Sequence, residues 1–215
     1  MNRITDPTSY EAWYQTPRGH WIGDREFDLL QNLLRPRAGA TLLDVGCGTG
    51  YFTRRFAHFG LKVTGIDPDP KALEYAKKLS GEITYLLAEA SKLPFADNSF
   101  DHTIAVTSLC FIGNPHHALD ELWRVTRRAV VLGLLNRHSL LYRQKQGQGS
   151  YRGARWDTAA EVVKKWIPAL SPEPEAVTVR SAIFLPSGGK IARCCEQMLS
   201  SSLLQGAFLA VYLEK

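Results

Sequence analysis

Three glycines at alternate positions, Gly46, Gly48 and Gly50, directly follow an apolar segment at residues 41–45. Glycine tolerates positive φ angles and has no Cβ, so a glycine-rich turn can approach a bound ligand closely. Open α/β sheets bind nucleotide-like cofactors where a strand ends in such a turn and a helix follows. Asp44 lies two residues before the first glycine and would place a carboxylate at the mouth of this crevice. The pattern therefore predicts a cofactor site.

The glycine spacing and the neighbouring acids favour a cationic nucleoside over a dinucleotide. In the dinucleotide fingerprint G-x-G-x-x-G the third glycine brings a helix N-terminus to a pyrophosphate, whereas here that glycine comes one residue earlier. The charge of Asp44 would repel a pyrophosphate but suits a ligand that carries an ammonium and a sulfonium group. The next predicted strand, 62–66, ends at Asp67, where a carboxylate can accept hydrogen bonds from both hydroxyls of a ribose. A nicotinamide oxidoreductase is therefore disfavoured, and the sequence contains no phosphate loop of the form G-x-x-x-x-G-K-[ST].

The run 43–50, Leu-Asp-Val-Gly-Cys-Gly-Thr-Gly, resembles the first motif of class I S-adenosylmethionine-dependent methyltransferases. A second stretch, 86–95, resembles the third motif of that family, with Glu89 where aspartate is more common. The likeness covers roughly residues 38–135 and is strongest to the type 11 group, which includes quinone-biosynthesis enzymes. It implies S-adenosyl-L-methionine as cofactor and S-adenosyl-L-homocysteine as product.

The resemblance also implies which residues contact the cofactor. The loop residues Gly46, Cys47 and Gly48 would lie under its methionine part, Asp44 would face the amino group, and Asp67 would hold the ribose. Pro68 would form a wall for the adenine, whose edge would meet Glu89 and the Ala90 amide. The end of the fourth strand would bring Thr107 close to the sulfonium. An amino-terminal Tyr-x-x-Trp-Tyr segment is similar to one that closes the site in this group, and it adds Tyr10 and Tyr14, with Trp13 either closing the site or packing a helix.

The acceptor side is less sharply defined. Its candidates are aromatic and basic residues near the amino terminus and after the fifth strand: His20, Trp21, Arg137, Tyr142, Tyr151 and Arg152. Such a set suggests an acceptor with an anionic part and a planar or apolar part. His138 is a candidate general base, because the ordinary pKa of histidine lies near 7, but a histidine in a polar loop is also commonly just exposed.

The elements that position these residues alternate between strand and helix, which favours a Rossmann-like α/β fold with a mostly parallel sheet. The expected strands are 41–45, 62–66, 83–88, 101–107, 128–135, 177–185 and 206–213, and the resemblance implies that the C-terminal strand is reversed. Helices are expected at 26–34, 51–59, 70–79, 116–126, 158–168 and 190–200, with residues 1–23 irregular. We expect one methyltransferase domain over 1–215, with an N-terminal cap segment at 1–35 and an acceptor-side insertion at 136–170.

Composition bounds the remaining possibilities. The 215 residues carry a net charge of +5 with scattered basic pairs, which makes nucleic-acid binding unlikely. No apolar run is long enough for a membrane span and no signal peptide is evident, so a cytoplasmic location is expected. The four cysteines lack zinc-site spacing, and no metal is expected. The favoured function is methyl transfer to a small molecule by in-line displacement; the alternatives are an RNA- or protein-directed methyltransferase and an inactive cofactor-binding accessory protein. The oligomeric state stays open.

Overall fold

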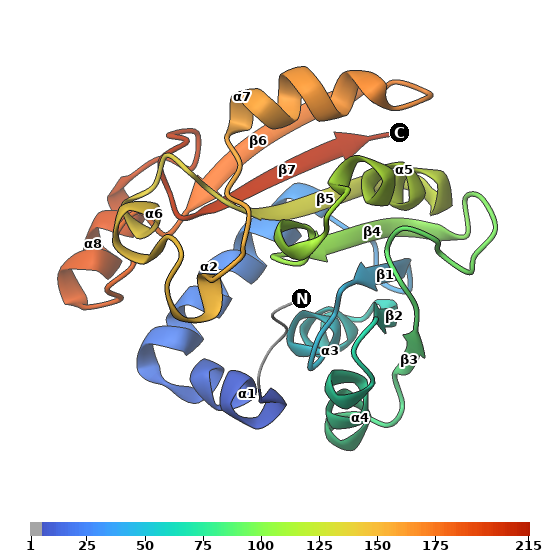
Figure 1. The fold of residues 1–215 in the computed structure, drawn as a ribbon, viewed down its shortest axis with the longest axis horizontal. Helices are drawn as coiled ribbons and strands as arrows, with labels where there is room; N and C mark the ends of the chain where they lie inside the picture. Colours follow the sequence, from blue (N-terminus) through green and yellow to red (C-terminus); the bar gives the residue numbers. More distant parts are fainter. Residues whose placement is uncertain (1–5) are drawn as a thin grey trace.

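Seven strands form one sheet in the order β3-β2-β1-β4-β5-β7-β6 in the computed structural model, which describes residues 6–215 (Figure 1). The strands are β1 (Thr41–Val45), β2 (Lys62–Asp67), β3 (Thr84–Leu87), β4 (Phe100–Val106), β5 (Thr126–Leu135), β6 (Ala176–Ala182) and β7 (Phe208–Glu214). Strands β1 to β5 pair in parallel, and β7 runs antiparallel to both of its neighbours, β5 and β6. The Rossmann-like, mostly parallel sheet with a reversed C-terminal strand is thus confirmed.

Helices cover both faces of this sheet. They are α1 (Pro7–Gln15), α2 (Pro17–Leu34), α3 (Tyr51–His58), α4 (Pro70–Leu79), α5 (Pro115–Val125), α6 (Leu140–Lys145), α7 (Ala159–Glu161) and α8 (Lys190–Met198). Four short helical turns complete the set: η1 (Leu109–Phe111), η2 (Gly149–Tyr151), η3 (Val162–Trp166, with π-helical hydrogen bonding) and η4 (Ile167–Ala169). The helix expected over 158–168 is therefore built from α7, η3 and η4 in succession.

Side chains alternate between the two faces of the parallel strands, and this alternation divides the core. Leu42 packs with the buried faces of α2 and α3, whereas its neighbour Leu43 packs with α5 and with the segment that contains Trp166. Because strands buried on both faces read as nearly continuous apolar runs, this arrangement explains the sequence of β1 and β5. The sheet reverses its strand order between β1 and β4, and the carboxyl ends of these strands face the crevice where open α/β sheets bind ligands.

Residues 7–15 and 17–34 are helical, which corrects the irregular structure expected over 1–23; residues 1–5 of that stretch lie outside the described residues. Asp6 caps α1 and Thr16 caps α2, and each helix starts with a proline, which favours the first helical turn. Because aromatic residues and glycines interrupt the helical repeat of apolar residues, the sequence pattern did not predict these helices. Gly23 is explained by packing, since a Cβ there would lie 2.3 Å from the hydroxyl oxygen of Tyr51. We call α1 and α2 the cap helices.

Residues 136–158 leave the sheet after β5 and return to it. Asn136 and Asp157 form an isolated parallel bridge, and the Asp157 amide donates to the Leu135 carbonyl at 2.9 Å. Between them lie α6 and η2, so this part of the expected insertion is partly helical. Trp156, which is 5% exposed, anchors the segment in the core beside Tyr142 and Tyr151.

Candidate functional site

The loop Gly46–Gly50, which we call the cofactor loop, joins β1 to α3. Its three glycines have φ angles of +75°, +55° and +78°, which L side chains rarely adopt. The amides of Gly46 and Cys47 both donate to the Ile66 carbonyl, at 2.8 and 2.9 Å, and tie the loop to the end of β2. A Cβ on Gly46 would lie 2.3 Å from the Cβ of Ser108. The loop is therefore a tight backbone cradle between the ends of β1, β2 and β4.

Asp67 ends β2 beside this cradle. One of its carboxylate oxygens accepts from the Gly48 amide at 2.9 Å and the other from the Asp69 amide at 2.8 Å. These backbone donors hold the carboxylate in a fixed orientation. A carboxylate oxygen can accept more than one hydrogen bond, so the same oxygens can also receive hydroxyl donors.

Asp44 is almost fully buried at the end of β1, and the Thr53 hydroxyl donates to its Oδ2 at 2.7 Å. Burial, together with the charge of Asp67, raises the pKa of Asp44 to about 7, although the Thr53 hydrogen bond opposes this shift. The carboxyl is thus close to half-protonated at neutral pH. A cationic group placed against it would favour the ionised form.

This raised pKa has a consequence for stability. In the ligand-free protein Asp44 keeps its proton up to about pH 7, whereas the unfolded chain releases it near the ordinary aspartate pKa of 3.8. The unfolded state therefore binds fewer protons between these pH values, and the free energy of unfolding falls as pH rises through that window. We expect Asp44→Asn, which keeps an acceptor for Thr53, to remove a decline on the order of 3 kcal/mol between pH 4.5 and 7.5. Urea unfolding of both proteins at these two pH values measures it; equal pH dependence would contradict the assignment.

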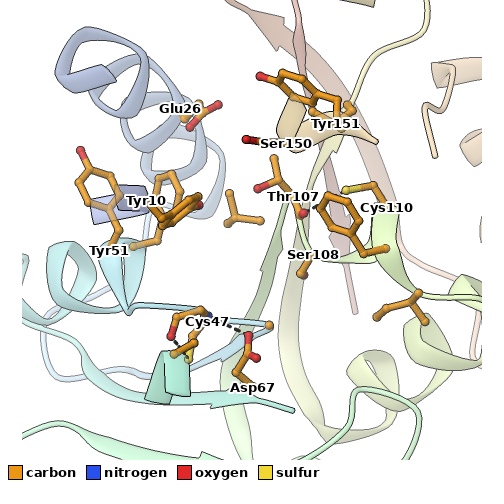
Figure 2. A pocket seen from close by; sticks show the side chains of 18 of the residues that line it. Tyr10, Glu26, Cys47, Tyr51, Asp67, Thr107, Ser108, Cys110, Ser150 and Tyr151 are labelled. Carbon is orange, nitrogen blue, oxygen red and sulfur yellow. Dashed lines mark hydrogen bonds between the residues drawn. The ribbon is translucent and has the colours of Figure 1, made fainter. Parts of the chain in front are cut away.

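A cavity of about 1550 Å³ lies over the carboxyl ends of the strands. Figure 2 shows Cys47 and Asp67 on one side of it, Thr107 and Ser108 in the middle, and Glu26 and Tyr151 on the far side. All eleven residues predicted to bind the cofactor line this cavity: Tyr10, Tyr14, Asp44, Gly46, Cys47, Gly48, Asp67, Pro68, Glu89, Ala90 and Thr107. The structure therefore brings the predicted set together, and their contacts with a cofactor stay a prediction.

The cap helices close one side of the cavity with aromatic rings. The hydroxyls of Tyr10 and Tyr14 lie 3.2 Å apart, and the Tyr14 ring stacks on Tyr51 with centroids 3.6 Å apart. Burial raises the pKa of both Tyr10 and Tyr14, so these phenols are neutral at physiological pH. Neutral rings of this kind exclude water and offer π faces to a cation.

Helix α1 is fastened to the cofactor loop by one buried acid, Glu11. The Thr49 hydroxyl donates to this carboxylate at 2.7 Å, and the Arg54 guanidinium forms an ion pair with it. Arg54 also donates to the Thr49 carbonyl at 2.6 Å. The cap and the loop are thereby held as one unit, so the aromatic side of the cavity is positioned relative to the glycines.

Thr107 directly follows β4 and has a φ angle of +49°, a conformation that is unfavourable for a β-branched residue. Its amide donates to the Gly133 carbonyl at 2.7 Å, which holds this geometry. Strain of this kind concentrates at ligand sites. Thr107 lies in the middle of the cavity, and the sequence predicted that it approaches the sulfonium.

On the acceptor side, Tyr151 and Arg152 line the cavity and the other candidates do not. Trp21 is buried in the core instead. His20 is exposed and lies 3.4 Å from Asp24 on the outer side of α2. Arg137 forms an ion pair with Glu161 at 3.0 Å and donates a hydrogen bond to the Trp156 carbonyl. Tyr142 packs on the Trp156 ring.

The general-base candidate His138 is also outside the cavity. Its side chain is exposed, and its backbone amide donates to Asn136 at 3.0 Å in the turn that leaves β5. The geometry thus places no catalytic role on this histidine. The turn directs the chain back toward the core, and this direction cannot be deduced from the identity of the residues alone.

Two residues stand out among the cavity residues that were not predicted as site residues. Tyr51 stacks on Tyr14, and Glu26 projects from α2 into the cavity (Figure 2). A signal for Glu26 existed in the sequence. It lies four residues after Ile22 and four before Leu30, so a charge interrupts the buried stripe of the helix.

Comparisons with known proteins agree with this geometry. A family model described as a methyltransferase domain, type 11, matches residues 43–132. An uncharacterized methyltransferase of Mycolicibacterium vanbaalenii is 40% identical over 93 residues, which are 42% of this chain and 36% of that protein. A malonyl-[acyl-carrier protein] O-methyltransferase of Serratia marcescens is 36% identical over 94 residues, 44% of this chain and 37% of that protein.

A solved structure from Thermotoga maritima is similar over nearly the whole chain. It is described as an S-adenosylmethionine-dependent methyltransferase, "possible histamine N-methyltransferase", with a TM-score of 0.78 and 26% identity. The match covers 97% of this chain and 95% of that one. The chain spans between about a third and about half of the length of the curated relatives that it matches.

The fold and the site of this chain are those of the class I S-adenosylmethionine-dependent methyltransferases. Residues 43–132 match the type 11 methyltransferase-domain model, and S-adenosyl-L-methionine is the cofactor that this match and the Thermotoga structure imply. The described residues fit that molecule, because a glycine cradle, a fixed carboxylate at Asp67 and a buried acid at Asp44 adjoin one cavity.

Within residues 6–215, no helix is both long and apolar enough to traverse a bilayer, and no cluster of three or more His, Cys, Asp or Glu side chains could hold a metal ion. Cys47, Cys110, Cys194 and Cys195 are all free thiols.

Proposed function

We propose that this chain transfers the methyl group of S-adenosyl-L-methionine to a small-molecule acceptor by in-line displacement. The observation that carries the proposal is the continuity of one cavity, which extends from the cofactor loop and Asp67 to an aromatic side beneath the cap helices. When bound, the cofactor supplies a methyl group on a sulfonium. The protein supplies position and a water-poor environment, which can provide most of the acceleration of such a reaction.

Each part of the cavity has a role in this proposal. Asp67 holds the ribose, the cofactor loop and Asp44 receive the methionine part, and residues 88–91 border the adenine. Thr107 and Ser108 lie between this half and the half that is open for an acceptor. The cap helices, fastened through Glu11, cover that second half and favour a small acceptor over a macromolecular surface.

The printed descriptions of similar proteins point to different acceptors. The Serratia protein is described as an O-methyltransferase of malonyl-[acyl-carrier protein], and the Thermotoga protein as a possible histamine N-methyltransferase. Both descriptions support methyl transfer, but they do not agree on its target. The acceptor of this chain must therefore be argued from its own side chains.

The proposal is tested with methyl-labelled cofactor and an extract of RNA, protein and metabolites, separated afterwards by size. We expect label in the small-molecule fraction together with an equal amount of S-adenosylhomocysteine. Label retained only with RNA or protein would support a macromolecule methyltransferase. Cofactor binding without any transfer would support an inactive accessory protein.

A further inference from the structure

Glu26 is a carboxylate inside the cavity that the cofactor contacts proposed above do not use. It projects from the inner side of α2, on the stripe that otherwise packs against the sheet (Figure 2). Within residues 6–215 it makes no hydrogen bond or ion pair. Glu26 is half-buried, so its carboxylate reaches the cavity, where a bound ligand can supply the partner that the chain does not.

The nearest cation of α3 does not serve as that partner. Arg55 donates to the Tyr51 hydroxyl at 2.9 Å and forms an ion pair with Asp24 at 2.8 Å. Burial raises the pKa of Glu26 to about 8, and the charge of Arg55 offsets this only in part. No cation of α3 therefore forms an ion pair with the Glu26 carboxylate.

Four tyrosines line the cavity close enough to feel the charge of this carboxyl: Tyr10, Tyr14, Tyr51 and Tyr151. Burial is the main cause of their raised pKa values, and the nearby charge of Glu26 raises each of them further. The hydroxyls of Tyr10 and Tyr14 pair with each other at 3.2 Å. A carboxylate among neutral aromatic rings is the combination that recognises an organic cation, through an ion pair and through π faces.

The position of Glu26 relative to Asp67 assigns it to the acceptor half. Figure 2 shows these two acids on opposite sides of the cavity, with Thr107 and Ser108 between them. If the ribose lies at Asp67, the far side receives the molecule that is methylated. Three basic residues line the cavity. Lys145 and Arg152 are exposed, and Arg18 is half-buried but donates to the Pro186 carbonyl at 2.7 Å, so its guanidinium is held by the backbone.

We propose that Glu26 and the tyrosines around it recognise an acceptor that carries a protonatable nitrogen, and that this nitrogen is methylated. This replaces the anionic acceptor expected from the basic residues of the sequence, and it rests on the proposed methyl transfer. Two of these tyrosines, Tyr10 and Tyr14, were predicted from the sequence to contact the cofactor, and this proposal places them at the acceptor instead.

The proposed methylation begins with a proton transfer. An ammonium acceptor gives one proton to the Glu26 carboxylate and exposes a nitrogen lone pair. That lone pair forms the new carbon–nitrogen bond while the methyl–sulfur bond breaks, and the electron pair of the broken bond stays on the sulfur of S-adenosylhomocysteine. The methylated ammonium leaves, and Glu26 releases its proton to water.

The test uses the protein saturated with S-adenosylhomocysteine and measures binding by calorimetry. The ligands are benzylamine, 2-phenylethylamine and 3-phenylpropylamine, each paired with the alcohol of the same carbon skeleton. We expect at least one amine to bind at least tenfold more tightly than its alcohol. Glu26→Gln should remove this preference while leaving the Kd of S-adenosylhomocysteine unchanged.

Asp28→Asn is the matched control, because Asp28 lies on the same helix, pairs with Arg25 and does not line the cavity. It should leave the amine preference intact. The proposal is overturned if no amine is preferred, or if Glu26→Gln retains the preference. It is also overturned if Glu26→Gln weakens S-adenosylhomocysteine binding, which would place Glu26 on the cofactor. If the wild-type protein binds no S-adenosylhomocysteine, it is the proposed methyl transfer that fails.

Discussion

Replacing Asp67 with alanine is expected to weaken the binding of S-adenosylhomocysteine at least about 100-fold. The two ribose hydroxyls would each lose a hydrogen bond to a charged acceptor, and each such bond contributes about 1.5–3 kcal/mol. Calorimetry gives the Kd of both proteins directly. Thermal denaturation gives an independent readout, since a ligand that binds only the folded state raises the Tm and the variant should lose that rise.

Asp67 also accepts from the Gly48 and Asp69 amides, so the variant needs a control for folding. The Tm of the ligand-free variant and its near-UV circular dichroism show whether the loop region is retained. Glu74→Ala removes the same charge from the exposed surface of α4, where Glu74 pairs with Lys78 at 2.7 Å, and this variant should bind the ligand normally. A folded Asp67→Ala protein with a wild-type Kd would refute the ribose assignment.

Gly46→Ala is expected to abolish detectable binding of S-adenosylhomocysteine and to destabilise the protein by more than the cost of its backbone angle. An L residue at a φ of +75° costs about 1–2 kcal/mol. The new Cβ would in addition lie 2.3 Å from the Cβ of Ser108, which is held by a 2.7 Å hydrogen bond to the Val45 carbonyl. Relief of this clash must displace the cofactor loop or the end of β4.

Gly39→Ala separates the cost of the backbone angle from the cost of the steric clash. Gly39 has a φ of +78°, and no atom lies within 4 Å of its added Cβ, so only the backbone cost applies. We expect Gly39→Ala to lose about 1–2 kcal/mol of stability and no affinity. Adding Ser108→Gly to Gly46→Ala removes the colliding atoms and should recover part of the stability. Equal stability losses for Gly46→Ala and Gly39→Ala, measured by urea unfolding, would show that the cradle tolerates a side chain.

The cofactor half could be predicted from the sequence because its geometry is local. A strand, a glycine turn and a helix follow one another within residues 41–58, and Asp67 ends the strand paired with β1. Parallel pairing alone brings the ends of these strands to one edge. The residues of this half are therefore placed correctly once the strands are recognised.

The acceptor half could not be predicted in this way, because it depends on packing between distant segments. The cap helices and residues 148–152 meet there, and no period in the sequence specifies their contact. Trp21 turned into the core, and Arg137 and His138 turned away from the cavity, although their side chains could have served an acceptor. Glu26 was missed because a helix expected to begin at residue 26 starts at Pro17, so this acid lies within a buried stripe rather than at a helix end.

The most direct test of the cofactor site is a crystal structure of this chain with S-adenosylhomocysteine. We predict both ribose hydroxyls within hydrogen-bond distance of the Asp67 carboxylate, the amino group on the side of Asp44, and the adenine beside residues 88–91. Density for the nucleoside away from the cofactor loop, or a ribose with no contact to Asp67, would contradict this site.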